Sequence, residues 1–356
     1  MIRSLRAALL LSIALTSGCS FIEKANQQSQ LAELQSNAQN GNVSAQLALG
    51  KELERGETID KDPDAALDWY RKAASGGSVE AAYRAARLLQ SNKTQNPDEI
   101  KSLLEQAAIG GYGPAQLKLG DLLMKQSSDD GTLNRIYNLY LAAAEQGLKD
   151  AQYKVAELLV NGLGTQKNLD SAFMWYSEAA TQGDERAQLA TGDFYLAGIS
   201  VPASIQNALK WYRQSATKGS VQAQANMGDL LTLQRYAVVR DFKEGAQWYR
   251  QAASQGHAHA SARLGQLYEV GNGVPRNTAL AANWFRRSAD SGNSSAQCRL
   301  GSLHLRGLGV PQDNREAQRW FEMAAAQIPT GVTSRLGFIY YDCEEFDTDS
   351  ILAPTS

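Results

Sequence analysis

The chain has 356 residues, with 35 Lys and Arg against 37 Asp and Glu, so its formal net charge at pH 7 is −2. This near balance excludes the basic surface that nucleic-acid-binding proteins carry. After residue 18 no apolar run approaches the roughly 20 residues that a membrane-spanning helix needs. The N-terminus is therefore the only segment that the sequence marks for contact with a membrane.

Residues 1–18 are predicted to be a lipoprotein signal peptide. Arg3 and Arg6 make a basic start, and Ala7–Leu15 is an apolar run too short to span a bilayer. The ending Leu15-Thr-Ser-Gly-Cys19 resembles a bacterial lipobox. This resemblance implies that Cys19 becomes the first residue and carries the lipid, such as palmitate. The alternative is an ordinary signal peptide with an incidental cysteine.

The same resemblance, with Ser20 after the cysteine, implies the periplasmic face of the outer membrane. Each buried methylene of an acyl chain adds about 0.8 kcal/mol, so a multiply acylated cysteine anchors almost permanently. Residues 19–29 are predicted to be the lipidated cysteine and a short tether, which would keep the folded part near the bilayer.

Tryptophan marks a repeat in the rest of the chain. All six tryptophans hold one position of it, and the last five are separated by 36, 37, 36 and 36 residues. They are Trp69, Trp175, Trp211, Trp248, Trp284 and Trp320. Leu103 and Leu139 hold the same position between the first and second tryptophan. A fixed period of this size predicts stacked two-helix units.

Each repeat contains two predicted helices, because apolar residues recur at three- and four-residue spacing in two segments. The A helix opens at an alanine such as Ala187, and the B helix carries the tryptophan position. A glycine eight residues after that position, such as Gly183, predicts a left-handed cap. A small residue five positions into the A helix, such as Gly192, predicts that a Trp or Tyr ring of the B helix presses against this backbone.

These positions together resemble the Sel1-like repeat family, a relative of the tetratricopeptide repeats. Residues 260–275 and 281–289 are close to the family pattern, and the resemblance covers residues 30–341. It implies an all-α fold, an α-solenoid (superhelix) of about eight two-helix repeats plus capping helices. Such a solenoid holds proteins together and performs no chemistry.

Capping elements are expected at both ends of the repeats. Leu31–Asn40 is predicted to be a B-like helix without its tryptophan, and a ninth A-like helix is expected around Leu336-Gly337. Residues 342–356 are acidic and poor in apolar side chains, which predicts a disordered tail.

The sequence gives no support for catalytic residues, a cofactor or a metal site. His257 and His259 are two residues apart, which directs them to different faces of a helix. His304 takes a position held elsewhere by tyrosine, so it should pack. No His-Glu-x-x-His, Gly-x-Ser-x-Gly or phosphate-loop pattern occurs. We therefore expect a binding protein and not an enzyme.

Two positions of the A helix carry the candidate partner-binding residues. The third residue after the opening alanine is Arg84, Lys118, Lys154, Ala190, Asn226, Arg263, Arg299 or Arg335. The sixth is Arg87, Asp121, Glu157, Asp193, Asp229, Gln266, Ser302 or Phe338. Both positions avoid the buried set, so they should face an open inner surface, and the pairs Lys118–Asp121 and Lys154–Glu157 can form along their own helices.

Toward the C-terminus the acids vanish and leave Arg263, Arg299 and Arg335 as a ladder. Arginine can bind a carboxylate with two hydrogen bonds, so the ladder is predicted to meet an acidic protein segment or an anionic polysaccharide. The alternative is a solvated basic stripe, or pairing with acids of neighbouring repeats.

The function expected from these observations is a lipid-anchored periplasmic scaffold that binds proteins of a cell-envelope assembly through the concave face of the solenoid. One alternative, by analogy with a solenoid lipoprotein of alginate export, is an accessory role in exopolysaccharide secretion. Another is regulation of a cell-wall enzyme by direct binding.

Cys298 and Cys343 would meet an oxidising periplasm. In a regular ninth repeat they would be separated by roughly 13 Å of helix rise and about 10 Å between helices. A disulfide needs Cα atoms within about 7 Å. The spacing therefore argues against a bridge between them.

Overall fold

The computed structural model describes residues 26–91, 96–126 and 129–327, and every regular element in these ranges is helical. The chain forms two compact units, Met1–Lys167 and Asn168–Ser356. Successive helices pack in pairs within each unit, which confirms the predicted α-solenoid of two-helix repeats. Cys19, Arg335, the ninth A-like helix and the acidic tail lie outside the described residues.

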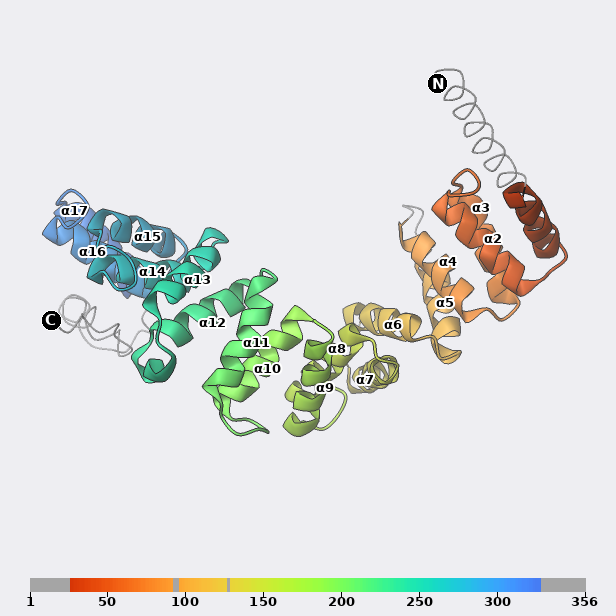
Figure 1. Ribbon diagram of the computed structural model, residues 1–356, viewed down its shortest axis with the longest axis horizontal. Coiled ribbons are helices and arrows are strands. Elements are labelled where there is room, and N and C mark those ends of the chain that lie inside the picture. The colour runs from red at the N-terminus through yellow and green to blue at the C-terminus, as the bar shows by residue number, and fades with distance from the viewer. Residues whose placement is uncertain (1–25, 92–95, 127–128, 328–356) are drawn as a thin grey trace, which may run out of the picture. The chain divides into compact units, whose positions relative to one another are not determined.

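The N-terminal unit begins, in its described part, with a helix over residues 26–39. Its A helices are α2 (Val43–Arg55), α4 (Val79–Ser91), α6 (Gly113–Gln126) and α8 (Lys149–Asn161). Its B helices are α3 (Pro63–Ser75), α5 (Pro97–Ile109) and α7 (Asp130–Glu145). Each helix from α2 to α8 packs against the next one along the chain, as the ribbon of this unit shows (Figure 1).

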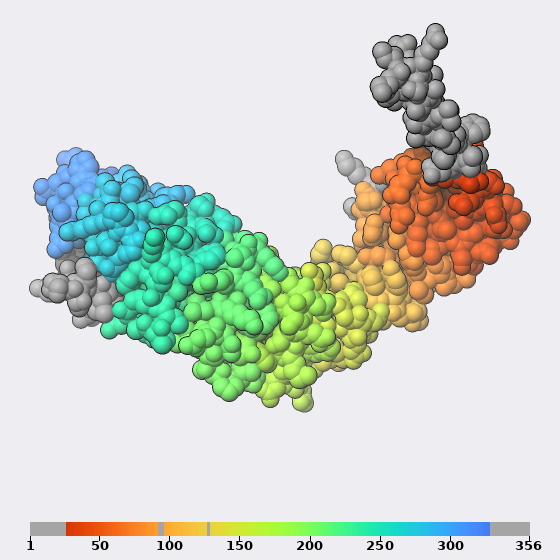
Figure 2. Space-filling view, in the orientation of Figure 1, coloured from red at the N-terminus to blue at the C-terminus, as the bar shows by residue number. Residues whose placement is uncertain are grey.

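The C-terminal unit repeats the same order. Its A helices are α10 (Glu185–Ala197), α12 (Val221–Thr232), α14 (Ala258–Val270) and α16 (Ser294–Arg306). Its B helices are α9 (Leu169–Thr181), α11 (Ile205–Thr217), α13 (Phe242–Ser254), α15 (Thr278–Asp290) and α17 (Asn314–Ala325). Here α12 also contacts α14, so neighbouring A helices meet. The surface of each unit consists of bands that follow the order of the sequence (Figure 2).

The helix over residues 26–39 covers the N-terminal end of the first repeat. Ala38 is fully buried and packs in one cluster with Ala45 and Leu49 of α2, beside the half-buried Leu31 and Leu34. This is the packing expected of a B-like capping helix. The helix is already formed at residue 26, so the last residues of the predicted tether are helical.

The residue after the tryptophan position forms the centre of each repeat. Aromatic side chains at this position are buried: Tyr70, Tyr140, Tyr176, Tyr212, Tyr249, Phe285 and Phe321. Six of these rings lie on a glycine of the A helix, whereas Ala156 holds the glycine position in the repeat of Tyr176. A β-carbon placed on Gly192 would be 2.5 Å from the Tyr212 ring, and one on Gly265 would be 2.9 Å from the Phe285 ring. Only glycine leaves this space, which offsets its cost of about 1 kcal/mol within a helix.

In the second repeat both partners of this contact change. Leu104 replaces the ring there, and Ala86 replaces the glycine, and both are buried. The sequence predicted a ring on the glycine but left Trp and Tyr as equal candidates. The structure assigns the contact to the Tyr or Phe that follows the tryptophan position.

The tryptophans pack less deeply than this ring. Trp248 and Trp320 are buried, at 9% and 5% exposure, whereas Trp69, Trp175, Trp211 and Trp284 are half-buried. Trp248 of α13 packs in one cluster with Tyr212 of α11 and Met227 of α12. The indole therefore seals the junction with the preceding repeat, while the following residue fills the centre of its own repeat.

Glutamine side chains close the junctions between repeats. The glutamine after the opening alanine donates a hydrogen bond to a carbonyl eight residues earlier, at the end of the preceding B helix. Gln224 Nε2 lies 3.2 Å from the Ala216 oxygen, and Gln297 Nε2 lies 3.1 Å from the Ala289 oxygen. These bonds satisfy carbonyls that a helix end leaves without partners. The left-handed glycine that the sequence predicted follows, with φ of 105° at Gly219.

Two local features differ from the regular repeat. A 3₁₀ helix, η1 (Gln234–Val239), lies between α12 and α13 and leaves Val238 exposed. Cys298 of α16 is disulfide-bonded, and its partner lies outside the described residues. Cys298 is therefore not a free thiol, whereas the predicted absence of a bridge to Cys343 concerns a residue outside the described ranges and stays a prediction.

Candidate partner-binding face of the A helices

The acids at the sixth position of the A helix accept hydrogen bonds from the buried tyrosines. Tyr212 Oη donates to Asp193 at 2.6 Å, and Tyr140 Oη donates to Asp121 at 3.0 Å. A buried tyrosine hydroxyl requires such a partner. Burial first, and then the neighbouring carboxylate, raise the pKa of both hydroxyls well above the usual 10, so they remain donors.

This contact explains why the acids vanish toward the C-terminus. The ring of the last two repeats is Phe285 or Phe321, and the sixth position then holds Gln266 or Ser302. Phenylalanine has no hydroxyl to satisfy, so the acid has no structural task. The sequence contained this signal, because Asp121, Asp193 and Asp229 occur with Tyr, and Gln266 and Ser302 occur with Phe. The first repeat differs, since its Tyr70 Oη donates to Glu54 at 2.6 Å.

The cations at the third position join neighbouring A helices. Arg84 Nη1 lies 3.0 Å from Glu54 Oε2 of the preceding A helix. Lys154 Nζ lies 3.2 Å from Asp121 of the preceding A helix instead of pairing with Glu157. The predicted pair Lys118–Asp121 does form, at 3.9 Å. Ion pairs of this exposure stabilise by about 0.2–1 kcal/mol each.

The arginine ladder is engaged in the same way. Arg299 Nη2 lies 3.5 Å from Glu269 Oε2 of the preceding A helix, and Arg263 Nη1 donates to Gln266 Oε1 at 3.0 Å. Both arginines are half-buried. The interpretation that these cations pair with neighbouring repeats is therefore correct for Arg299. Binding of a partner by the ladder stays a prediction.

The pKa values of two acids at equivalent positions, Asp193 and Asp229, are shifted in opposite directions. Burial raises the pKa of Asp193 above its usual value, although the hydrogen bond from Tyr212 works against this. Burial also acts to raise the pKa of Asp229, but His259, Tyr249 and Arg263 outweigh it and the pKa is lowered. Side chains of α14, His259 and Arg263, thus favour the charged form of Asp229 on α12.

The histidines serve this architecture. His257 caps the N-terminus of α14, where its Nδ1 accepts the Ala260 N–H at 3.2 Å, and burial and then the charge of His259 lower its pKa. His259 Nε2 lies 3.0 Å from Asp229 Oδ1. The two rings are only 6.2 Å apart, so the prediction of different faces is wrong, because His257 precedes the helix. His304 is buried, as expected.

We searched the described residues for a metal site and for a membrane-spanning helix. Among them, no three or more His, Cys, Asp and Glu side chains gather where a metal ion could be held. Within the same ranges, no helix has both the length and the apolar character required to cross a bilayer.

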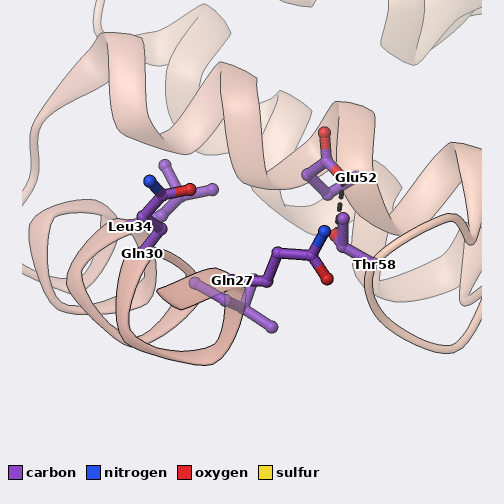
Figure 3. Close-up of a pocket in the computed structure, with 6 residues that line it drawn as sticks. Gln27, Gln30, Leu34, Glu52 and Thr58 are labelled. Atoms are coloured by element: carbon purple, nitrogen blue, oxygen red, sulfur yellow. Dashed lines mark hydrogen bonds between the residues drawn. The ribbon is translucent and has the colours of Figure 1, made fainter. Parts of the chain in front are cut away.

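A hollow of about 210 Å³ lies at the N-terminal end of the described chain, between the first helix and α2. Gln27, Gln30, Leu31 and Leu34 line one side, and Glu52 and Thr58 the other (Figure 3). Thr58 Oγ1 donates to Glu52 Oε2 at 2.6 Å. Among the described residues of this lining, Glu52 is the one ionisable side chain.

The repeats identify the family. The Sel1 repeat family matches residues 43–78, 149–184, 186–220, 221–257, 258–293 and 294–328, which together make up more than half of the chain. The chain belongs to the Sel1 repeat family. The unmatched interval contains the two repeats in which Leu103 and Leu139 replace tryptophan.

Solved structures agree with this assignment. The chain is similar to a Sel1 repeat protein from Oxalobacter formigenes, with 29% identity, a TM-score of 0.60 and coverage of 85% of this chain and 87% of that one. It is also similar to c5321, described as a protective antigen of uropathogenic Escherichia coli with an SLR fold. There the identity is 26%, the TM-score is 0.52 and the coverage is 87% and 82%.

Sel1 repeat solenoids are protein–protein interaction scaffolds, and proteins of this family are typically not enzymes. The repeated contacts described above agree with that class. The polar side chains of the A helices hold repeats together and leave a long, chemically similar face, as a binding scaffold requires.

Proposed function

We propose that this chain is a lipid-anchored periplasmic scaffold that binds proteins of a cell-envelope assembly through its A helices. The observation that carries the proposal is the recurrence of polar residues at the same two positions of most A helices, on the side away from their buried residues; Ala190 of α10 is an exception. Solenoids use such extended faces to bind other proteins.

The polar face suits a protein partner better than a free anionic polymer. Arg299 and Lys154 are already paired with acids, so the face offers cations and carboxylates together. A partner with both charges can exchange these pairs for its own at little net cost, and electrostatic complementarity of this kind gives specificity.

The binding face can be tested by replacing two cations of the C-terminal unit. We expect R263Q/R299Q to weaken capture of envelope proteins by affinity purification from the outer membrane, with the lipid intact. Glutamine is preferable to glutamate, because a negative charge beside Glu269 would also destabilise the repeat. The matched control is R71Q, which removes an inter-repeat ion pair with Glu99 on the B helices of the N-terminal unit, away from the proposed face.

Unchanged capture by R263Q/R299Q would remove the C-terminal cations from the binding face. Equal losses in R263Q/R299Q and R71Q would show that repeat stability, and not local recognition, controls capture. Thermal unfolding of each variant separates these two outcomes.

The lipid anchor is tested separately through Cys19. We expect the wild-type chain to incorporate labelled palmitate and to sediment with outer membranes, and C19A to lose both properties. Palmitate in C19A, or a soluble wild-type chain, would contradict the anchor without affecting the scaffold proposal.

A further inference from the structure

The B helices of neighbouring repeats are joined by a recurring ion pair. It links the residue two positions after the tryptophan position with the residue four positions before it in the next repeat. In the N-terminal unit Arg71 Nε lies 2.8 Å from Glu99 Oε1, and Arg135 Nη2 lies 2.9 Å from Glu105 Oε1. The pair keeps its geometry although the charges are exchanged between the two sides.

In the C-terminal unit this ion pair also binds an indole. Arg213 Nη2 lies 2.9 Å from Glu244 Oε1, and Trp248 Nε1 donates to the same oxygen at 3.0 Å. One carboxylate thus satisfies a guanidinium and a buried indole N–H together. We call this arrangement the indole staple.

The last repeat carries the same residue types but does not close the staple. Arg286, Glu316 and Trp320 hold the equivalent positions. Arg286 Nη2 instead meets His304 Nε2 at 3.0 Å, and Glu316 pairs with Arg319 at 3.4 Å. Trp320 is 5% exposed, and its buried Nε1 has no hydrogen-bond partner.

His304 explains why Arg286 is held back. Its Nδ1 lies 3.3 Å from the Pro311 carbonyl oxygen, which can only accept, so Nδ1 carries the proton. Nε2 then has a lone pair that accepts from Arg286. In the preceding repeat Arg250 makes the corresponding bond to the hydroxyl of Tyr268, at 2.9 Å, but no acid stands opposite it.

The open staple borders a cavity of about 530 Å³. Arg286, Arg319 and Trp320 line it and offer two guanidinium groups and one indole N–H, all of them donors. Asp290, Asp313 and Glu316 also line it; the Asp313 carboxylate already accepts the backbone N–H groups of Arg315 and Glu316, and Glu316 pairs with Arg319. An unsatisfied buried donor is unfavourable, so a ligand that accepts a hydrogen bond from Trp320 Nε1 relieves that cost.

We propose that this cavity binds a carboxylate of a partner protein, an Asp or Glu side chain, between Trp320 Nε1, Arg286 and Arg319. The occupant is inferred from the chain itself, because in the closed staple the same place is filled by the carboxylate of Glu244. The inference rests on the proposed scaffold function and gives the partner a chemical class. It also places recognition on the B helices α15 and α17, away from the arginine ladder.

Tryptophan indole resonances test the proposal in the full chain. With ¹⁵N-labelled tryptophan, six indole N–H signals are expected, one for each tryptophan, and W320F and W248F assign two of them. The probe is acetyl-Glu-Glu-Glu-amide, and the control peptide is acetyl-Gln-Gln-Gln-amide. We expect the acidic peptide to move the Trp320 signal downfield and saturably, while the Trp248 signal stays in place because its N–H is already bonded.

Matched variants measure the role of the open staple. We expect R286Q to weaken binding of the acidic peptide about tenfold, the usual value of one charge-assisted hydrogen bond. R213Q removes the equivalent arginine of the closed staple and should leave peptide binding unchanged. E316Q should strengthen binding, because it removes the internal carboxylate that could compete for the site.

Three results would overturn the inference: an unmoved Trp320 signal, an equal shift with the glutamine peptide, or a Trp320 signal already as far downfield as that of Trp248. The last result would show that Glu316 closes the staple in solution. If Trp320 fails to respond while capture of envelope proteins persists in R286Q, the scaffold proposal stands alone. If Trp320 responds but no protein is captured, the carboxylate site stands and the scaffold proposal fails.

Discussion

The tyrosine repeats and the phenylalanine repeats of the C-terminal unit solve the same packing problem in two ways. In both, a ring fills the centre and lies on a glycine of the A helix. Tyr212 and Tyr249 add a hydroxyl, which requires an acid, and Asp229 in turn gathers His259. Phe285 and Phe321 have no hydroxyl and need none of these partners. The sixth position of the A helix therefore changes from Asp in α10 and α12 to Gln266 in α14 and Ser302 in α16. The presence or absence of the tyrosine hydroxyl thus correlates with an acid or a neutral residue at the sixth position of the A helix.

The largest effect is expected where the ring meets the helix backbone. G192A places a β-carbon 2.5 Å from Tyr212, and G265A places one 2.9 Å from Phe285. Tyr212 is also held by its hydroxyl and cannot tilt away, so G192A should cost about 2–3 kcal/mol and G265A about 1 kcal/mol or less. Amide hydrogen exchange within each repeat measures both, and equal losses would contradict the difference between the two ring types.

Exchanging the two rings should give the next largest effect. Y249F removes the 2.6 Å bond to Asp229 and should cost about 1–2 kcal/mol. F285Y buries a hydroxyl opposite Gln266 and should cost a similar amount. The double variant F285Y/Q266D should recover part of that loss in urea unfolding, and a double variant no better than F285Y would disprove the coupling of ring and acid.

A smaller effect, with opposite signs, is expected at the two acids. Because the folded state lowers the pKa of Asp229, this residue stabilises the fold at pH values above its ordinary pKa of 3.8. That stability is lost as the pH falls through the folded pKa. The raised pKa of Asp193 acts in reverse, so its contribution is present at low pH and is lost as the pH rises through the folded pKa.

D229N should therefore destabilise the protein by about 1 kcal/mol at pH 7, whereas D193N should be neutral or stabilising. Both differences should shrink below pH 4, as thermal unfolding across pH can measure. A loss of stability in D193N at pH 7 would show that the charged carboxylate of Asp193 is stabilised by more than the cost of its burial, and would contradict this prediction.

The smallest effect is expected from the inter-repeat ion pair of the phenylalanine repeats. R299Q should cost about 0.5 kcal/mol or less, because the pair with Glu269 is long and partly exposed. The loss should disappear in 1 M salt, where the screening length is about 3 Å. A double-mutant cycle with E269Q measures the pair, and a coupling above about 1 kcal/mol would assign Arg299 to the structure of the repeat.

Much of the fold was readable from the period alone. The tryptophan spacing predicted the two-helix repeats, and the glycine after each B helix predicted its cap. The small residue in the A helix predicted a ring against the backbone. These features recur because each repeat must bury the same face against the next, and a fixed spacing records that requirement directly.

The ion-pair partners on the candidate binding face could not be predicted as well from the sequence. Lys154 pairs with Asp121 of another helix and not with Glu157 of its own, and Arg299 pairs with Glu269. A linear pattern places residues on a helix but does not say which neighbouring helix a long side chain reaches. The sequence also did not predict that Cys298 is disulfide-bonded, because spacing along the chain does not say which cysteine a thiol meets.

The sequence by itself therefore determined the family, the two-helix repeat and the pairing of ring with glycine, because these follow from local periodicity and the volume of single residues. Only the tertiary structure decided which aromatic residue fills the core, which acid receives its hydroxyl, and why the staple at Trp320 stays open while that at Trp248 is closed. Those outcomes depend on distances of a few ångströms between side chains of different helices, such as Tyr212 and Asp193, which are 19 residues apart, or Arg213 and Glu244, which are 31 apart, and a linear pattern does not fix them.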